Sequence, residues 1–399
     1  MNVCSVIYRR PDITPDGTCV VLWKISSELA KLGCNIHIVF ISPKDHYPSE
    51  FTVNSIYFHS IGAQHSNSII EKLTFMKLGS QKLEEIEKKF GIDIFSFHGP
   101  ASLPLLFYFR KKSRKPFIYH TYAALPFEMQ TYLLDSSTKS LLLFLRKLLM
   151  YTFYIPLEFI ALKYIEGLIV PTFKTIEEFK RCYRLLPSSI SVVPLGQDIF
   201  DRYQSRISGK LARLEDKKVL LFVGNDWYRK GVWYLLLAFA VVHKKIPNTL
   251  LVLTGPPQVS FISLAKRLKI IDSIIFAGNP DEETLAKLYA SCDIFVLPSF
   301  HEGFSQTIVE AMAFAKPVVT TPIAGYPVVT SGQEGFIIPP ADYKAIATSI
   351  ITLLKNEWLY QKMSHNAFKK AKKYTWEKSA KKILAIYQNY KNMIKNEKV

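Results

Sequence analysis

The chain has 399 residues, of which 49% are hydrophobic, enough for large packed cores, so a mainly disordered protein is excluded. Its 17 glycines and 22 prolines follow no period, which excludes collagen-like and low-complexity architectures. The formal net charge of +18 favours anionic partners such as a phosphorylated ligand, an anionic membrane or nucleic acid. A source organism with generally lysine-rich proteins would explain the same excess.

Five cysteines lie far apart in the sequence. Their odd number and the lack of a C-x2-C pair argue against a disulfide framework and a zinc site, so a reducing, cytoplasmic compartment is expected. The first residues, MNVCSVIYRRPD, are typical of a buried strand and unlike a secretory signal. No stretch offers about 18 uncharged apolar residues, so no membrane-spanning helix is expected.

Short apolar runs alternate with helical patterns along the chain, which predicts a βαβ series. In the first half, the expected strands are 3–8, 35–41, 92–97, 117–120, 167–171 and 191–194. After a polar, basic linker near 200–217, the expected strands are 218–223, 249–254, 273–277, 293–297, 317–320 and 335–338.

The apolar runs are continuous, as expected for parallel strands covered by helices on both faces. We therefore predict an α/β protein with two doubly wound parallel-sheet domains, at 1–200 and 201–375. The tail at 376–395 has apolar residues at helical spacing, so an amphipathic helix is predicted there, and it must pack against other parts of the chain.

Two cations follow the first predicted strand of the second domain, at the strand end where open parallel sheets bind ligands. They are Arg229 and Lys230, directly before a helix that starts near Val232. Free amides at a helix amino end favour an anion, and the two cations suit a diphosphate. An exposed charged turn is the alternative interpretation.

Two carboxylates follow the fourth predicted strand of that domain, Glu302 and Glu310, with seven residues between them. Gly303, Phe304 and Ser305 allow a tight turn and offer amides to an anion at the start of the next helix. Glu310 lies within that helix, where its carboxylate can accept hydrogen bonds from two vicinal hydroxyls, as on a ribose. For Glu302, a solvated loop residue or a helix cap is the alternative.

The stretch PSFHEGFSQTIVEAMAFAKPVVTTPIAG, at 298–325, resembles the E-x7-E element of family 4 glycosyltransferases. The resemblance extends to EGFIIPPADYKAIA, FVGNDWYRKG, LTGPP and VVPLGQD, and covers the carboxyl half well and the amino half thinly. It implies the GT-B fold, with two Rossmann-like domains facing each other across a cleft. The first would take the acceptor, the second the nucleotide sugar, and the C-terminal helix would cross back to the first.

The resemblance also implies roles for matching residues. Glu310 would hold the ribose, Glu302 the donor sugar's hydroxyls near the reacting carbon, and His120 would lie beside that sugar. His98 is a looser match, and for both histidines a core histidine satisfied by its neighbours is the alternative. The residues implied to meet the diphosphate are Arg229, Lys230, Gly303, Phe304, Ser305 and, in the amino domain, Gly17 and Thr18.

The chain departs from the usual family pattern at several positions. Asp16 precedes a single Gly17 where two adjacent glycines are usual, and Asn225 stands where many members have Arg. Ser305 replaces the commoner Gly, and Val328 stands where a Glu is often found. These changes bear on donor identity more than on the chemistry, because the two cations after the first strand remain.

The sequence holds no two aspartates separated by one residue, so it lacks the D-x-D metal site common in the other large glycosyltransferase fold. We expect a metal-independent reaction, with no cofactor and a UDP- or GDP-type sugar as donor substrate, in which helix amides, Arg229 and Lys230 stabilise the leaving diphosphate. The resemblance implies retention of anomeric configuration. A second catalytic carboxylate of the glycosidase type is not evident.

An apolar stretch at 139–163 lies on the expected acceptor side. With a nearby basic cluster it could dock on an anionic bilayer, which favours a peripheral protein with a lipid-linked or glycan acceptor. A core helix beside scattered surface charge is the alternative, as is a soluble acceptor. One helical face carries Leu141, Leu142, Phe144, Leu145, Leu148 and Leu149, and the basic cluster is Arg110, Lys111, Lys112, Arg114 and Lys115.

Other functions fit the sequence less well. A non-enzymatic or inactive nucleotide-sugar-binding homologue would lose groups near the sugar, yet Glu302 is present. A nucleic-acid binder would need a basic groove with interleaved aromatics, which is not readable here, so no nucleic-acid partner is expected. A sugar-nucleotide 2-epimerase on the same fold would carry its own pattern, which is not recognisable. We therefore predict a hexosyltransferase.

Overall fold

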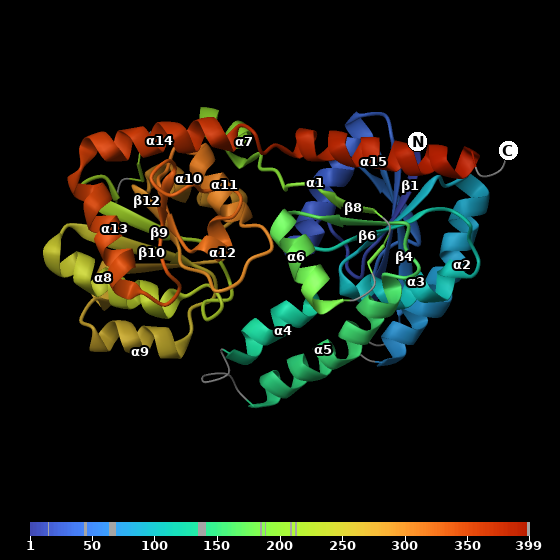
Figure 1. Cartoon of the computed structure of the whole chain (residues 1–399), viewed down its shortest axis with the longest axis horizontal. Helices are drawn as coiled ribbons and strands as arrows, with labels where there is room; N and C mark the ends of the chain where they lie inside the picture. Colours follow the sequence, from blue (N-terminus) through green and yellow to red (C-terminus); the bar gives the residue numbers. More distant parts are fainter. Residues whose placement is uncertain are drawn as a thin grey trace. The chain divides into compact units, whose positions relative to one another are not determined.

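The computed structural model describes residues 1–14, 16–43, 46–63, 69–134, 141–183, 186–187, 189–207, 210–211 and 214–396. These residues form two compact units, and each is an α/β structure (Figure 1). The first unit comprises the described residues of Met1–Gln130, Ser136–Leu195 and Trp376–Val399, and the second those of Thr131–Asp135 and Gly196–Thr375.

The first unit is built on a sheet in the strand order β3-β4-β2-β1-β5-β6-β7-β8. The strands are β1 (Asn2–Val6), β2 (Asn35–Pro43), β3 (Glu50–Val53), β4 (Ile56–Ala63), β5 (Ile94–His98), β6 (Phe117–His120), β7 (Gly167–Val170) and β8 (Ser189–Val192). They pair in parallel except for β3, which is antiparallel to β4. Because β1 pairs with both β2 and β5, the direction of winding reverses there, which is where doubly wound sheets bind ligands.

Helices pack on both faces of this sheet. They are α1 (Gly17–Lys31), α2 (Ile69–Phe90), α3 (Leu103–Arg110), α4 (Leu125–Leu134), α5 (Leu141–Ala161), α6 (Phe173–Cys182) and α15 (Trp376–Asn396). Helix α3 contacts α2 and α5, and α1 contacts α15 (Figure 1). No helix in the described part of the chain is both long enough and apolar enough to cross a bilayer.

The second unit has a sheet in the order β11-β10-β9-β12-β13-β14, and its strand pairs are parallel. The strands are β9 (Lys218–Phe222), β10 (Thr249–Thr254), β11 (Ile274–Gly278), β12 (Ile294–Leu297), β13 (Val318–Thr320) and β14 (Gly335–Ile337). Winding reverses between β9 and β12, so the loops that follow these two strands lie side by side.

The helices of this unit fall between and after those strands. They are α7 (Ile199–Tyr203), α8 (Val232–Lys245), α9 (Val259–Arg267), α10 (Glu282–Ser291), α11 (Gln306–Ala313), α12 (Pro322–Gly325), α13 (Tyr343–Lys355) and α14 (Glu357–Ala371). The predicted α/β class with parallel sheets in both domains is confirmed.

The C-terminal helix α15 belongs to the first unit. Its buried face carries Ala380, Ile383 and Tyr387, at the helical spacing seen in the sequence. Near its end, the Lys391 ammonium lies 2.8 Å from the carboxylate of Asp93. The last helix of the chain therefore completes the unit that the first strand begins.

Candidate functional site

The loop after β9 is held in place by Trp227. This indole is fully buried, and its Nε1 donates to the backbone oxygens of Gly224 at 3.0 Å and Thr254 at 2.8 Å. At Gly255 an added Cβ would lie 2.2 Å from the Gly224 oxygen, so the loops after β9 and β10 touch through their backbones. This anchoring fixes the segment that carries the two cations.

Gly231 brings that segment against the end of β12. Its φ of 74° is in the left-handed region, and a Cβ there would lie 2.2 Å from the backbone oxygen of Pro298. The amide of Phe300 also donates to the oxygen of Arg229 at 2.9 Å. Glycine is therefore required at 231 for two independent reasons.

Arg229, Lys230 and Glu302 form one charged cluster. The Lys230 Nζ lies 2.9 Å, and the Arg229 Nη1 3.3 Å, from Oε1 of Glu302. The Ser299 hydroxyl lies 3.2 Å from the same oxygen, and Arg229 also donates to the backbone oxygen of His301. The structure thus brings together three side chains that the sequence placed after two different strands.

The charge of Glu302 is fixed by its neighbours. Burial by itself would raise the pKa of this carboxyl, but the charges of Lys230 and Arg229 and the hydrogen bond from Lys230 outweigh it and lower the pKa to about 2. The carboxylate is therefore ionised at neutral pH. The Asp226 carboxylate also lies 3.6 Å from Arg229, so within the cluster two cations face two carboxylates and their charges balance.

The amino end of α11 lies directly after this cluster. Ser305 is its N-cap residue, but its side chain makes no capping hydrogen bond. The hydroxyls of Ser305 and Thr307 are buried and have no hydrogen-bond partner among the described residues. Phe304 is also buried, and its ring packs 5.9 Å from that of Tyr374. Amides and hydroxyls at this helix end are thus available to a ligand.

Glu310 lies on α11 and is oriented from α10. The Tyr289 hydroxyl donates to Oε2 of Glu310 at 2.8 Å, and Tyr289 is fully buried. The carboxylate position is therefore set by a rigid partner, as a binding group for hydroxyls requires.

In the first unit, Gly17 and Thr18 begin α1 directly after the loop from β1. The Asp16 carboxylate caps this helix, accepting from the amides of Thr18 at 2.9 Å and Cys19 at 3.4 Å. Amides that would face a phosphate are thus already bound to a carboxylate. The aspartate at position 16 therefore serves as the N-cap of α1.

His120 ends β6 and is buried in a hydrogen-bonded cluster of the first unit. Its Nε2 lies 2.8 Å from the Tyr387 hydroxyl, which donates to Ser96, and the Ser96 hydroxyl lies 2.7 Å from Nε2 of His98. The His98 and His120 rings stack at 4.3 Å. Burial lowers the pKa of His120 to about 3 and that of His98 well below its usual value, so both are neutral. His120 also lines a small cavity with Thr121.

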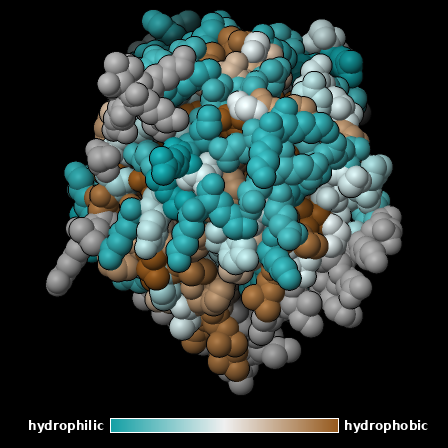
Figure 2. Space-filling model, turned by 90° about the vertical axis from the view of Figure 1, so that its right-hand side faces the viewer, coloured by the Kyte–Doolittle hydropathy of each residue, from teal (hydrophilic) through white to brown (hydrophobic). Residues whose placement is uncertain are grey.

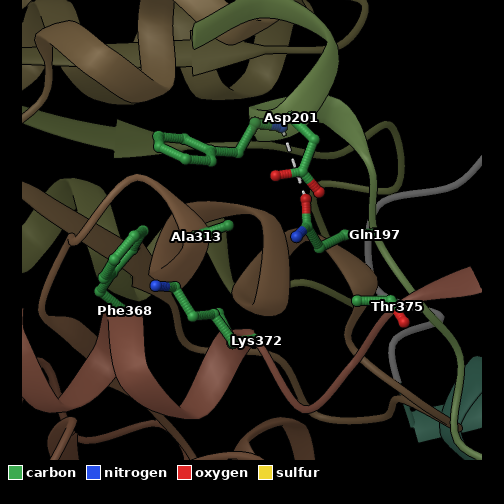
Figure 3. A pocket seen from close by; sticks show the side chains of 8 residues that line it. Gln197, Asp201, Ala313, Phe368, Lys372 and Thr375 are labelled. Atoms are coloured by element: carbon green, nitrogen blue, oxygen red, sulfur yellow. Dashed lines mark hydrogen bonds between the residues drawn. The ribbon is translucent and has the colours of Figure 1, made fainter. Parts of the chain in front are cut away.

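A second hollow, of about 210 Å³, lies elsewhere on the second unit. Its labelled residues come from α7, α11, α14 and the segments that flank them (Figure 3). None of its lining residues is a predicted site residue. Within the described chain, no group of three or more His, Cys, Asp and Glu side chains is arranged to hold a metal ion.

Sequence reasoning missed three positioning residues: Trp227, Tyr289 and Ser299. Trp227 lies inside the FVGNDWYRKG motif, where an apolar indole between polar residues is a usable signal of an anchor. Tyr289 lies 21 positions before Glu310, and no local pattern links the two.

Two family models match the chain, Glycosyltransferase Family 4 over residues 15–199 and Glycosyl transferases group 1 over residues 204–370. The chain is similar to an uncharacterized glycosyltransferase of Methanocaldococcus jannaschii, with 31% identity over 179 residues that cover 44% of this chain and 45% of that protein. It is also similar to N-acetyl-alpha-D-glucosaminyl L-malate synthase of Bacillus anthracis, with 29% identity over 203 residues, 50% of this chain and 53% of that protein. The chain thus spans about half the length of these curated relatives.

Solved structures share the whole fold. Sucrose-phosphate synthase from Thermosynechococcus elongatus has a TM-score of 0.79 at 17% identity, covering 97% of this chain and 98% of that one. HepE of Anabaena, in complex with UDP and glucose, has a TM-score of 0.72 at 17% identity, covering 98% and 100%. This likeness confirms the predicted GT-B fold.

Proposed function

Because the chain belongs to glycosyltransferase family 4, we propose that it transfers a hexosyl group from a nucleotide-diphosphate sugar to a hydroxyl of a glycan or lipid-linked acceptor. The observation that supports this best is the cluster of Arg229, Lys230 and Glu302 beside the unpartnered hydroxyls of Ser305 and Thr307. Cations, hydroxyls and helix amides at one strand edge suit a diphosphate.

In this proposal the donor lies along α11. Arg229, Lys230 and the amides of Gly303 to Ser305 bind the diphosphate, and Glu310 accepts hydrogen bonds from the ribose hydroxyls. Glu302 accepts from hydroxyls of the sugar, for which it must be ionised, as its lowered pKa provides. The two cations then pair with the diphosphate in place of part of their contact with Glu302.

We propose a metal-independent reaction with retention of configuration. The bond between the anomeric carbon and the diphosphate oxygen breaks, and the diphosphate leaves with the electron pair. The acceptor hydroxyl attacks from the same face and gives its proton to the leaving phosphate oxygen. Arg229, Lys230 and the α11 amides stabilise the charge that develops on the leaving group, so no cofactor takes part.

The first unit supplies the remaining proposed contacts. From the family resemblance we propose that Gly17 and Thr18 face the donor phosphates, for which the Asp16 carboxylate must release the Thr18 amide, and that His120 lies beside the sugar as a neutral imidazole. Its hydrogen bond to Tyr387 makes His120 a rigid group, so its proposed task is to position the sugar and not to move a proton. A reducing cytoplasm is the proposed compartment, which suits five free cysteines.

The test is a transfer assay with UDP-, GDP- and ADP-sugars in the presence of a chelator. UDP-glucose is the first donor to try, since the HepE structure holds UDP and glucose. We expect Glu302→Gln to abolish transfer while nucleotide binding persists, and Glu283→Gln, at a half-buried glutamate of α10 that pairs with Lys287, to leave transfer unchanged. The product's anomeric configuration, read by NMR, should match that of the donor.

Three results would contradict parts of this account. Nucleotide binding without turnover, on any acceptor offered, would favour the non-enzymatic alternative. If turnover stops with the chelator and returns only with a divalent ion, the proposed metal independence is wrong. A product with inverted anomeric configuration would contradict the proposed retaining mechanism.

A further inference from the structure

The face of α5 that points to solvent is apolar. At the described positions from Leu145 onward, its exposed residues include Leu149, with 71% of its surface exposed, and Phe153, with 48%. Ile160 is exposed on the same face. Tyr154 and Glu158 lie on the opposite, buried face. A core helix would bury its leucines, so the core-helix interpretation of this stretch is wrong at these positions.

Helix α2 extends this surface. The Lys72 ammonium lies 5.2 Å from the ring centroids of both Phe153 and Tyr154, which places the start of α2 against the middle of α5. Leu73 is next in sequence and is 58% exposed, and Lys77, one turn later, is also exposed. Figure 2 shows apolar side chains gathered at the lower end of this side of the first unit, where Figure 1 places α5 and the start of α2.

The charges on this surface are positive. Lys72, Lys77 and Lys163 flank the apolar residues. The carboxylates nearest in sequence, Glu71 and Glu158, are buried, and the Glu158 Oε2 accepts from the amide of Leu125 at 3.2 Å. No carboxylate is exposed among the described residues 71–78 and 145–164.

The basic cluster at 110–115 contributes less than its sequence predicts. Arg110 pairs with Glu166 and donates to the Lys115 oxygen, and the Lys112 ammonium lies 2.5 Å from the Glu84 carboxylate. Internal ion pairs thus engage two of its five cations. The side chains of 131–144, Arg146 and Lys147 lie outside the described residues.

We propose that the docking face, formed by Leu73, Leu149, Phe153 and Ile160 with Lys72, Lys77 and Lys163, binds an anionic lipid bilayer. Leucine and phenylalanine side chains enter the boundary between headgroups and acyl chains, while lysines beside them contact anionic headgroups. A second copy of the chain fits less well, because a two-fold interface would set these lysines against each other. The proposal does not depend on the transfer reaction, since docking needs no donor.

Co-sedimentation with vesicles tests this, using phosphatidylcholine alone or mixed with phosphatidylglycerol. The full chain should sediment with the mixed vesicles at low salt, and less at high salt because of screening. Leu149→Glu combined with Phe153→Glu should weaken binding at least about tenfold. Lys77→Glu should weaken it about fivefold or more, as expected for loss of a cation at an anionic surface. Each variant's fold is checked by circular dichroism.

Val259→Glu is the matched control, because Val259 is 80% exposed on α9 of the second unit and should not affect sedimentation. Wild-type protein that stays in the supernatant, or α5 variants that sediment like wild type, would overturn the proposal. So would a dimer, seen by analytical ultracentrifugation without vesicles, that Leu149→Glu dissociates, because the face would then bind a second copy.

Discussion

Glu302 is a largely buried carboxylate, with 11% of its side chain exposed, whose charge depends on two cations in a neighbouring loop. It is held between Lys230 and Arg229, and Ser299 contacts the same oxygen atom. Removing one partner of a buried ion pair leaves a charge in a poor environment, which costs more than the pair itself contributes. The same side chain therefore links stability to the proposed donor chemistry.

Lys230→Met tests this link. It removes the ammonium 2.9 Å from Glu302 while keeping a long side chain. We expect the free energy of unfolding at neutral pH to fall by about 3 kcal/mol, as for other broken buried pairs, and Lys230→Arg to recover part of it. Urea titration followed by circular dichroism measures this, and a loss below about 0.5 kcal/mol would show that the pair is not coupled to stability.

The pH dependence of that effect has a defined sign. The pKa of Glu302 is about 2 in the folded protein, against 4.5 without the fold, so folding favours the ionised form. Its stabilising contribution is complete above pH 4.5 and is lost as the pH falls toward 2. The stability gap between wild type and Lys230→Met should therefore narrow across this window, and a gap that stays constant on acidification would contradict the assignment.

A second prediction concerns how stability depends on pH through His120. Burial lowers its pKa from 6.5 to about 3, so the unfolded chain binds a proton that the folded protein does not. Stability is then lost as the pH falls from 6.5 toward 3, by about 1.4 kcal/mol per pH unit for one such histidine. His120→Gln should reduce that slope by this amount in urea titrations at stepped pH. An unchanged slope of stability against pH would mean that His120 is not buried in its neutral form.

At the scale of elements, the loop between β9 and α8 matters most, because it carries two site cations. We expect Gly231→Ala to destabilise the protein and weaken nucleotide binding at least about tenfold, since the new Cβ would displace the loop from Pro298. Gly332→Ala is a matched control. Its φ of 81° is also positive, but nothing lies within 4 Å of the added Cβ.

Gly332→Ala should therefore cost only about 1 kcal/mol of backbone strain, and nucleotide binding should be unaffected. Thermal unfolding measures the change in stability, and calorimetric titration measures the change in nucleotide affinity. Equal effects of the two variants on binding would show that the approach to Pro298 does not position the loop.

The elements show where sequence patterns suffice and where they fail. Continuous apolar runs predicted most of the parallel strands, because such strands are buried on both faces. The β3–β4 hairpin was missed. In the structure its two-residue turn is formed by Asn54 and Ser55, both with positive φ. The strand expected at 191–194 is β8, at Ser189–Val192. Edge strands are short and partly exposed, so their apolar signal is weak.

The candidate site was predictable in its residues but not in its contacts. Arg229, Lys230 and Glu302 could be chosen because each follows a strand, and β9 and β12 are neighbours in the sheet. The support from Tyr289 to Glu310 is a hydrogen bond between side chains of two different helices, α10 and α11, which no local pattern encodes. For α5, spacing gave an amphipathic face but could not tell which side the protein covers.

At the scale of the whole molecule, the chain leaves the first unit after Leu195 and returns to it at Trp376. The stability of the first unit therefore depends on the last helix of the chain. Tyr387 is its central contact, with hydrogen bonds to His120 and Ser96.

Tyr387→Phe removes both hydrogen bonds and leaves buried polar groups unsatisfied. We expect a loss of about 1 to 3 kcal/mol in the free energy of unfolding, with nucleotide binding in the second unit unchanged. Met393→Ala on the same helix is the control, because Met393 is largely exposed and should have little effect. A free energy of unfolding equal to that of wild type in Tyr387→Phe would show that these hydrogen bonds do not hold α15 to the first unit.

The most direct test of the central claim is calorimetric titration of UDP, GDP and ADP into wild type, Glu310→Gln and Tyr289→Phe, without added metal. We predict that one of the nucleotides binds wild type, that Glu310→Gln weakens it about tenfold or more by losing a charge-assisted hydrogen bond, and that Tyr289→Phe has a smaller effect. Absence of binding by all three, or equal affinity in Glu310→Gln and wild type, would contradict a donor site along α11.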